Sequence, residues 1–191
     1  MRPHASSWTL GTPSTPAPGT PIEKAAIDWS KTRAWGAGGY YARIFLNVKG
    51  REPEGVLDPS AVPAFVEQLT REFASVRKPD GQPLGAEVKV PRAIYHQVRG
   101  DAPDLMVYFG GSAWRSAGTI GYRTLFLEEN DTGPDDAVHS FDGMYAVVDP
   151  RSGAGAPGPA RRLIDIAPTL LTYFGVPVPA SIQGTAMPDF L

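Results

Sequence analysis

The sequence contains no cysteine and only three histidines among its 191 residues. Without cysteine, disulfide bonds and thiolate metal sites are excluded, although this absence does not identify a cellular compartment. A protein metal site needs three or four ligands, so three histidines without cysteine provide little material for one. Histidine and cysteine alone therefore do not supply a complete metal site in this sequence.

A large net charge and a long apolar run are also absent. The 18 basic and 20 acidic residues give a formal net charge of −2, and the basic residues form separated pairs rather than a stripe. This pattern does not indicate binding to nucleic-acid polymers or to an anionic membrane surface. No apolar run approaches the roughly 20 residues that span a bilayer, and no secretory signal is recognisable. We expect no membrane span, and localisation stays open with the cytoplasm as the default.

Residues 1–21 differ in composition from the rest of the chain. They contain five prolines, two glycines and seven serines or threonines, with Arg2 as the only fixed charge. Because no periodic apolar pattern is present, we expect a disordered Pro/Ser/Thr-rich tail over residues 1–26. Residues 27–191 form the expected folded part.

Strands and helices are expected to alternate along this folded part, which indicates an α/β fold. Apolar and β-branched runs predict strands at 44–48, 88–90, 104–109 and 144–148. The continuous run 104–109 suits a central strand buried on both faces, as in a parallel sheet. The segment 28–41, rich in aromatic residues and glycine, is expected to be an irregular loop.

Two amphipathic helices are expected, one after Asp58-Pro59 and one after Asp165. Each aspartate stands at the N-cap position, and Pro59 and Pro168 fall in first turns, where proline is tolerated. Gly175 is expected to end the second helix. The apolar faces expected to be buried are Val62, Phe65, Val66, Leu69, Phe73 and Val76 in the first helix, and Ile166, Ala167, Leu170, Leu171 and Phe174 in the second.

His139 ends an acidic, turn-rich loop and precedes an apolar segment. Together with Asp131, Asp135 and Asp136 it forms a set of oxygen ligands with one imidazole, which suits zinc or manganese. The spacing matches no single-segment metal motif, and the EF-hand pattern is absent. The alternative interpretation is an exposed acidic loop with a hydrogen-bonded histidine. Asp142 either accepts a hydrogen bond from the second ring nitrogen of His139 or is a turn residue that opens the following strand.

Four segments follow one another in an informative order. The first is the segment 42–55, which contains Asn-Val-Lys-Gly-Arg-Glu-Pro at 47–53. The others are Ala-Pro-Asp-Leu at 102–105, His-Ser-Phe-Asp-Gly at 139–143 and Asp-Ile-Ala-Pro-Thr-Leu-Leu at 165–171. In this order they resemble the C-terminal portion of the alkaline phosphatase superfamily, closest to the type I phosphodiesterase/nucleotide pyrophosphatase group and related phosphohydrolases. The resemblance covers residues 27–191.

This resemblance implies a partial three-layer α/β/α sheet and hydrolysis of a small-molecule phosphate ester with two divalent metals, usually zinc. In this family a Thr or Ser attacks phosphorus, and the metals activate the nucleophile and the water that releases the product. His139 occupies the position of the family's last metal-binding histidine, in the form His-x-x-Asp-Gly. We therefore predict His139 as a metal ligand.

The family's other catalytic residues have no counterpart here. The motif Asp-His-Gly is absent, because Pro3, Tyr95 and Val138 precede the three histidines, and no Ser or Thr occupies a strand-to-helix nucleophile turn. The parts that supply these residues would lie upstream of Ile27, where this sequence holds only the tail. We assign no catalytic residue and expect no phosphoesterase activity from this chain alone.

Three interpretations stay open at this point. The chain is the C-terminal portion of a metal-dependent phosphohydrolase, through a truncated gene, a wrong start site or a frameshift. Alternatively, it is a non-catalytic binding module or remnant of that family, or an unrelated α/β domain. A sheet without its neighbouring strands would expose an unpaired edge, so self-association through that edge is expected.

Overall fold

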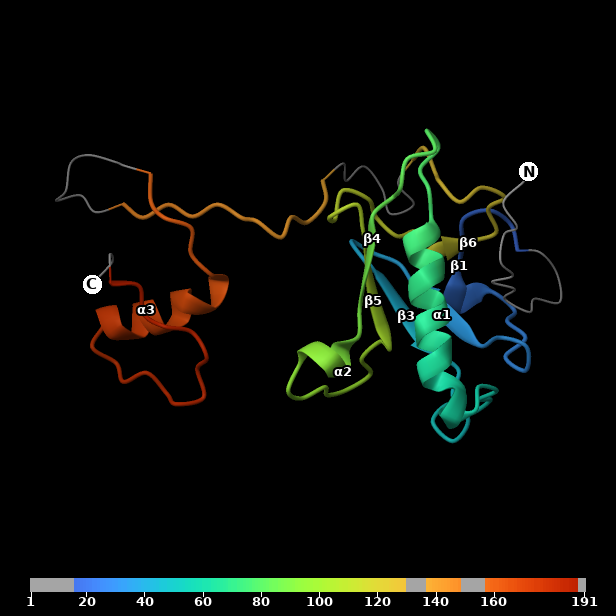
Figure 1. Ribbon diagram of the computed structural model, residues 1–191, viewed down its shortest axis with the longest axis horizontal. Helices are drawn as coiled ribbons and strands as arrows, with labels where there is room; N and C mark the ends of the chain where they lie inside the picture. The colour runs from blue at the N-terminus through green and yellow to red at the C-terminus, as the bar shows by residue number, and fades with distance from the viewer. Residues whose placement is uncertain (1–15, 130–136, 149–156, 189–191) are drawn as a thin grey trace. The chain divides into compact units, whose positions relative to one another are not determined.

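The computed structural model describes residues 16–129, 137–148 and 157–188, and the chain divides into two compact units (Figure 1). The first unit ends at Gly143 and the second begins at Met144. Both sheets and the longest described helix lie in the first unit, whereas the described part of the second contains a 3-10 turn and a short helix. The expected mixture of helices and strands is confirmed.

The main sheet of the first unit has four strands in the order β2-β3-β5-β4. Its strands are β2 (Ala34–Ala37), β3 (Ala42–Leu46), β4 (Ala86–Lys89) and β5 (Leu105–Phe109). Every neighbouring pair is antiparallel. The central position of β5 is confirmed, since Leu105, Met106 and Val107 are buried in succession. The expected parallel pairing is wrong.

The reason for the antiparallel pairing is the order in which the chain crosses the sheet. The helix α1 (Val62–Ser75) connects β3 to β4, and these two strands run in the same direction because each is antiparallel to β5. A crossover helix between two strands of equal direction is the usual β-α-β unit, here split by a third strand between them. The sequence pattern predicted these strands and the helix between them, but not that β5 lies antiparallel between β3 and β4.

The start of α1 follows the expected capping arrangement. The carboxylate of Asp58 accepts a hydrogen bond from the backbone N–H of Ser60 at 2.9 Å, and Pro59 opens a 3-10 turn, η2 (Pro59–Ala61), that leads into the helix. Phe65 and Leu69 on this helix are buried against a core that includes the fully buried Leu46 and Leu105. The helix thus covers one face of the sheet (Figure 1).

Two parts of the first unit are more regular than expected. Residues 20–21 form the strand β1 (Thr20–Pro21), which pairs with β6 (Thr119–Ile120), and a 3-10 turn, η1 (Ile22–Lys24), follows. The disordered tail predicted through residue 26 is therefore wrong for this stretch, while residues 1–15 lie outside the described residues. Such backbone pairing needs no apolar periodicity, so composition did not reveal it.

The predicted loop at 28–41 contains the strand β2. Its Trp35 stands opposite Phe45 of β3, and the two rings stack at a centroid distance of 5.3 Å. Aromatic cross-strand pairs of this kind stabilise antiparallel sheets. The glycines that follow Trp35, at positions 36, 38 and 39, hid the alternation that normally marks a strand.

In the second unit the predicted strand 144–148 is wrong. These residues form no strand, and Met144 is 97% exposed. A strand needs a neighbour for its backbone hydrogen bonds, and no strand occurs in the described part of the second unit, residues 144–148 and 157–188.

The expected second helix is present as α3 (Ile166–Tyr173), preceded by a 3-10 turn, η3 (Leu163–Asp165). Gly175, at a φ of 68°, ends the helix as predicted. Its N–H donates to the carbonyl of Thr172, and the N–H of Val176 donates to the carbonyl of Leu171. This pair of bonds is the Schellman arrangement. The expected burial of Ile166, Ala167, Leu170 and Phe174 is wrong, since all four are exposed, Phe174 to 71%, and only Pro168 and Thr169 are buried in the helix.

Asp165 precedes α3, but its side chain does not cap the helix. Its Oδ1 accepts hydrogen bonds from the backbone N–H of Thr185 and from Nη2 of Arg162, both at 2.9 Å. The hydroxyl of Thr169 donates to the Asp165 carbonyl and accepts from the N–H of Met187. Asp165 already has helical backbone angles after η3, so its carboxylate is turned toward the segment 185–187 instead of the first-turn amides.

None of the helices in the three described stretches is long and apolar enough to cross a bilayer.

The contacts of Asp165 predict a pH dependence in the second unit. The Arg162 guanidinium, followed by the Thr185 N–H, holds the pKa of Asp165 below its ordinary value of 3.8. A carboxylate with a lowered folded-state pKa stabilises the fold above its unfolded pKa, and this stabilisation is lost as the pH falls through the folded pKa. We expect the amide NMR shift of Thr185 to titrate with a midpoint below 3.8. The shift should not titrate in Asp165→Asn, and a midpoint at or above the ordinary value would contradict this account.

Candidate functional site

His139 lies on an aromatic surface of the first unit. Its exposed imidazole contacts the ring of Tyr40, with 4.0 Å between ring centroids. The guanidinium of Arg115 also lies over the Tyr40 ring, 4.8 Å from its centroid. Two residues along the chain, Phe141 packs on Tyr108 of β5 at a centroid distance of 5.0 Å. These ring contacts hold the segment 139–141 while leaving the imidazole accessible to solvent.

The aromatic surface beneath this segment continues across two strands. Tyr108 stacks on Tyr41 at a centroid distance of 5.0 Å, and partial burial raises the pKa of the Tyr108 hydroxyl. Asp142, at a bend of the chain, donates its backbone N–H to the Ser140 hydroxyl at 3.2 Å. Among the described residues no hydrogen bond joins its carboxylate to His139, so the orienting role of Asp142 stays a prediction.

The described residues do not complete a metal centre. In the described stretches 16–129, 137–148 and 157–188, no group of three or more His, Asp or Glu side chains lies close enough together to hold a metal ion. The predicted companions Asp131, Asp135 and Asp136 lie outside the described residues. Within the described residues, His139 is the residue that the sequence predicts as a zinc ligand.

A cluster of hydrogen bonds that the sequence did not predict surrounds Asn47, the residue that follows β3. This side chain is only 2% exposed, and its Nδ2 donates to the backbone carbonyls of Trp29, Thr32 and Glu54. Its backbone N–H donates to the Arg33 carbonyl. Asn47 therefore joins three chain segments at one point. The available signal was a lone carboxamide in an otherwise apolar strand, because buried polar groups are nearly always hydrogen-bonded.

A bidentate ion pair between Arg51 and Asp104 lies near the same strand end. Nη1 contacts Oδ1 and Nη2 contacts Oδ2, each at 2.7 Å. Arg51 also donates to the Leu46 carbonyl, and Asp104 accepts from the Leu46 N–H at 2.7 Å. The carboxylate of Asp104 is the main cause of the raised pKa of Arg51. Two of the segments that carry the family resemblance, 47–53 and 102–105, thus meet through a structural contact.

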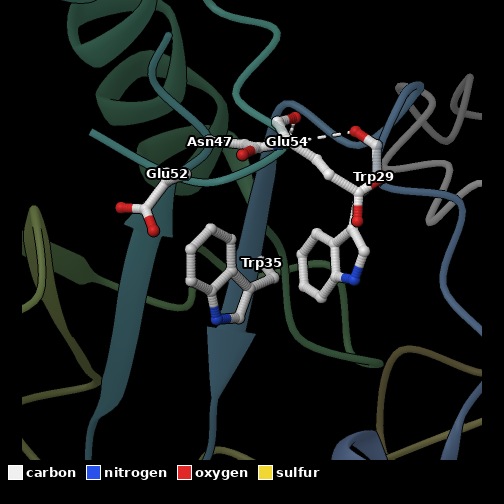
Figure 2. Close-up of a pocket in the computed structure, with 5 residues that line it drawn as sticks. All are labelled: Trp29, Trp35, Asn47, Glu52 and Glu54. Atoms are coloured by element: carbon white, nitrogen blue, oxygen red, sulfur yellow. Dashed lines mark hydrogen bonds between the residues drawn. The ribbon is translucent and has the colours of Figure 1, made fainter. Parts of the chain in front are cut away.

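A cavity of about 150 Å³ opens beside Asn47 and is lined by Trp29, Trp35, Asn47, Glu52 and Glu54 (Figure 2). The two indoles are nearly perpendicular, with an interplanar angle of 80° and 5.2 Å between centroids. In Figure 2 the Trp35 ring stands between the side chains of Glu52 and Trp29. The sequence predicted only an irregular, aromatic-rich loop at 28–41 and gave no sign of this cavity.

Comparisons with known proteins found no counterpart for this chain. No protein-family model, no curated protein and no solved structure matches it.

The ion pair between Arg51 and Asp104 is testable by a double-mutant cycle with Arg51→Met and Asp104→Asn. Asparagine keeps the shape of the side chain, so the cycle isolates the charge. We expect a coupling of about 1–2 kcal/mol in urea unfolding, limited because solvent screens a partly exposed pair. High salt should reduce this coupling. A value within about 0.3 kcal/mol of zero would show that the pair contributes no stability.

The loop between Asn47 and Leu57 predicts a second effect on stability. A Cβ atom on Gly55 would lie 2.2 Å from the Val48 carbonyl oxygen, so the backbone has to move. We expect Gly55→Ala to lower the free energy of unfolding by about 1–3 kcal/mol, measured in urea by tryptophan fluorescence. The matched control is Gly143→Ala, which meets no atom within 4 Å and should change stability by less than about 0.5 kcal/mol. Equal effects of the two substitutions would contradict the steric argument.

Proposed function

We propose that this chain is the C-terminal part of a metal-dependent phosphoric ester hydrolase of the phosphodiesterase/nucleotide pyrophosphatase type, with a partial three-layer α/β/α sheet. The observation that carries the proposal is the position of His139. It occupies the family's ligand position in His-x-x-Asp-Gly, and its imidazole is exposed beside Tyr40. A metal ligand has to be reachable in this way, because it must meet ligands from other segments.

In this proposal the chain contributes a scaffold and one ligand. The assemblies around Asn47 and the Arg51–Asp104 pair account for the resemblance at 47–53 and 102–105 as structural contacts. His139 accounts for the resemblance at 139–143. The remaining zinc ligands, apart from any that Asp131, Asp135 and Asp136 provide, and the Ser or Thr nucleophile come from elsewhere, so the 191 residues alone are inactive.

A non-catalytic binding module of the same family is the second candidate. The observation that favours it is that the first unit has its own hydrophobic core and pairs its buried polar groups. Among the described residues every buried side-chain nitrogen and oxygen has a hydrogen-bond partner. A core around Leu46, Leu69 and Val107 spans α1 and the central strands. Such a unit would fold and bind a ligand without catalysing a reaction.

Zinc titration of the purified chain, followed by NMR of the histidine side chains, tests the proposal. We expect weak saturable binding, because a single imidazole with few partners holds zinc poorly. The binding should be lost in His139→Ala and retained in His96→Ala, which removes an exposed histidine outside the assigned site. The purified chain should not hydrolyse bis-nitrophenyl phosphate above the rate with zinc alone.

Two outcomes would overturn parts of this proposal. Zinc binding that is unchanged in His139→Ala would remove His139 as a ligand and leave the binding module as the better account. Hydrolysis that co-purifies with the chain and is lost in His139→Ala would instead show that the active site is complete within these residues.

A further inference from the structure

The cavity beside Asn47 combines aromatic walls with hydrogen-bond acceptors. Trp35 is fixed by stacking on Phe45 at an interplanar angle of 14°, and Trp29 stands almost perpendicular to Trp35. The two indoles therefore form a corner. In Figure 2 their ring nitrogens lie on the side turned away from Asn47. The polar side chains that complete the lining, Asn47, Glu52 and Glu54, present oxygen atoms.

The oxygen of the Asn47 carboxamide is the first sign that this cavity is built for a ligand. Nδ2 of Asn47 makes three hydrogen bonds, but among the described residues no group donates to its Oδ1. Since no fully buried side-chain oxygen there lacks a partner, Oδ1 keeps some exposed surface, and Asn47 lines the cavity. A side chain that is 2% exposed thus offers a free acceptor to whatever enters.

The charges around the cavity are the second sign. Glu52 accepts from Nε of Arg51 at 2.9 Å, but the Arg51 guanidinium is shared with Asp104 through two further contacts. The carboxylate of Glu54 has no hydrogen bond or ion pair within the described stretches of the chain. Arg51 therefore pairs with two carboxylates, and the carboxylate of Glu54 adds a further negative charge to the lining of the cavity.

We propose that this cavity binds a small alkylammonium cation that carries N–H donors. Indole faces attract organic cations through their π electrons. The carboxylates of Glu52 and Glu54 and the Oδ1 of Asn47 supply acceptors for the ammonium hydrogens, and charge-assisted bonds of this type are stronger than neutral ones. A cavity of this volume holds a guest of about the size of benzene. An anion is excluded by the two glutamates.

This inference does not rest on the proposed phosphoester hydrolase. It uses neither His139 nor a metal, and the residues that form the cavity come from the loop before β2, from β2 itself and from the end of β3 with the loop that follows. Its success or failure is measured at residues other than those that test zinc binding.

The probe is ethylammonium chloride, titrated into the intact chain at constant ionic strength, with ethanol as the neutral molecule of similar size. Two-dimensional NMR follows the indole N–H groups of Trp29 and Trp35, and Trp114, which does not line the cavity, is the internal reference. We expect saturable shifts of Trp29 and Trp35 with ethylammonium and none with ethanol. Glu54→Gln should weaken binding about fivefold to tenfold, because it removes one charge without changing the shape.

The matched control is Glu67→Gln, which removes an exposed carboxylate from α1, outside the cavity, and should leave binding unchanged. Glu54 is exposed, and its carboxylate has no hydrogen bond or ion pair among the described residues, so Glu54→Gln, which leaves the backbone carbonyl bound to Asn47, should fold as the parent does. The absence of saturable shifts, or equal shifts in all variants, would overturn the inference. Saturation by methyl glucoside in place of ethylammonium would overturn it as well, because the cavity would then recognise a sugar.

Discussion

The buried carboxamide of Asn47 is the interaction on which the first unit depends. Its Nδ2 binds carbonyls of Trp29, Thr32 and Glu54, and its backbone carbonyl accepts from the N–H groups of Val56 and Leu57. The segment before β2, the end of β3 and the loop that leads to α1 are joined by these bonds. Without them a buried amide would lose its partners, which costs more than a typical hydrogen bond contributes.

The neighbouring ion pair extends this arrangement to the centre of the sheet. Arg51 and Asp104 each bond to the backbone of Leu46, so the end of β3 is fixed to the residue that precedes β5. The same geometry turns Glu52 and Glu54 toward the two indoles and creates the cavity. The segment 47–55 thus both joins these parts of the fold and forms the proposed binding cavity.

Much of the fold could be predicted where one local signal decides the structure. Asp58-Pro59 predicted the start of the first helix, Gly175 the end of the last one, and the run 104–109 the central strand. Predictions were wrong where the outcome depends on a distant partner. The segment 144–148 has the composition of a strand but no neighbouring strand among the described residues of its unit, and β1 has little strand character but pairs with β6.

For the candidate sites, too, the sequence predicted what depends on local residue types but not what depends on distant partners. His139 was predicted as a metal ligand from its motif and residue type, and the structure adds its contact with Tyr40. The assembly around Asn47 could not be predicted from spacing, because its carbonyl partners are backbone atoms that any sequence supplies. Only the fold brings positions 29, 32, 47 and 54 together. Patterns of residue types reveal ligands and nucleophiles, but they do not reveal which backbone groups surround them.

The central claim is that the chain carries one part of a phosphoester hydrolase site whose other part is encoded elsewhere. The most direct measurement is to sequence the locus and translate the DNA upstream of Met1 in all three forward frames. The account predicts an open stretch that encodes a Ser or Thr nucleophile in a strand-to-helix turn and an Asp-His-Gly motif. Upstream DNA without either feature would contradict it, and the chain would then be understood as a binding module in its own right.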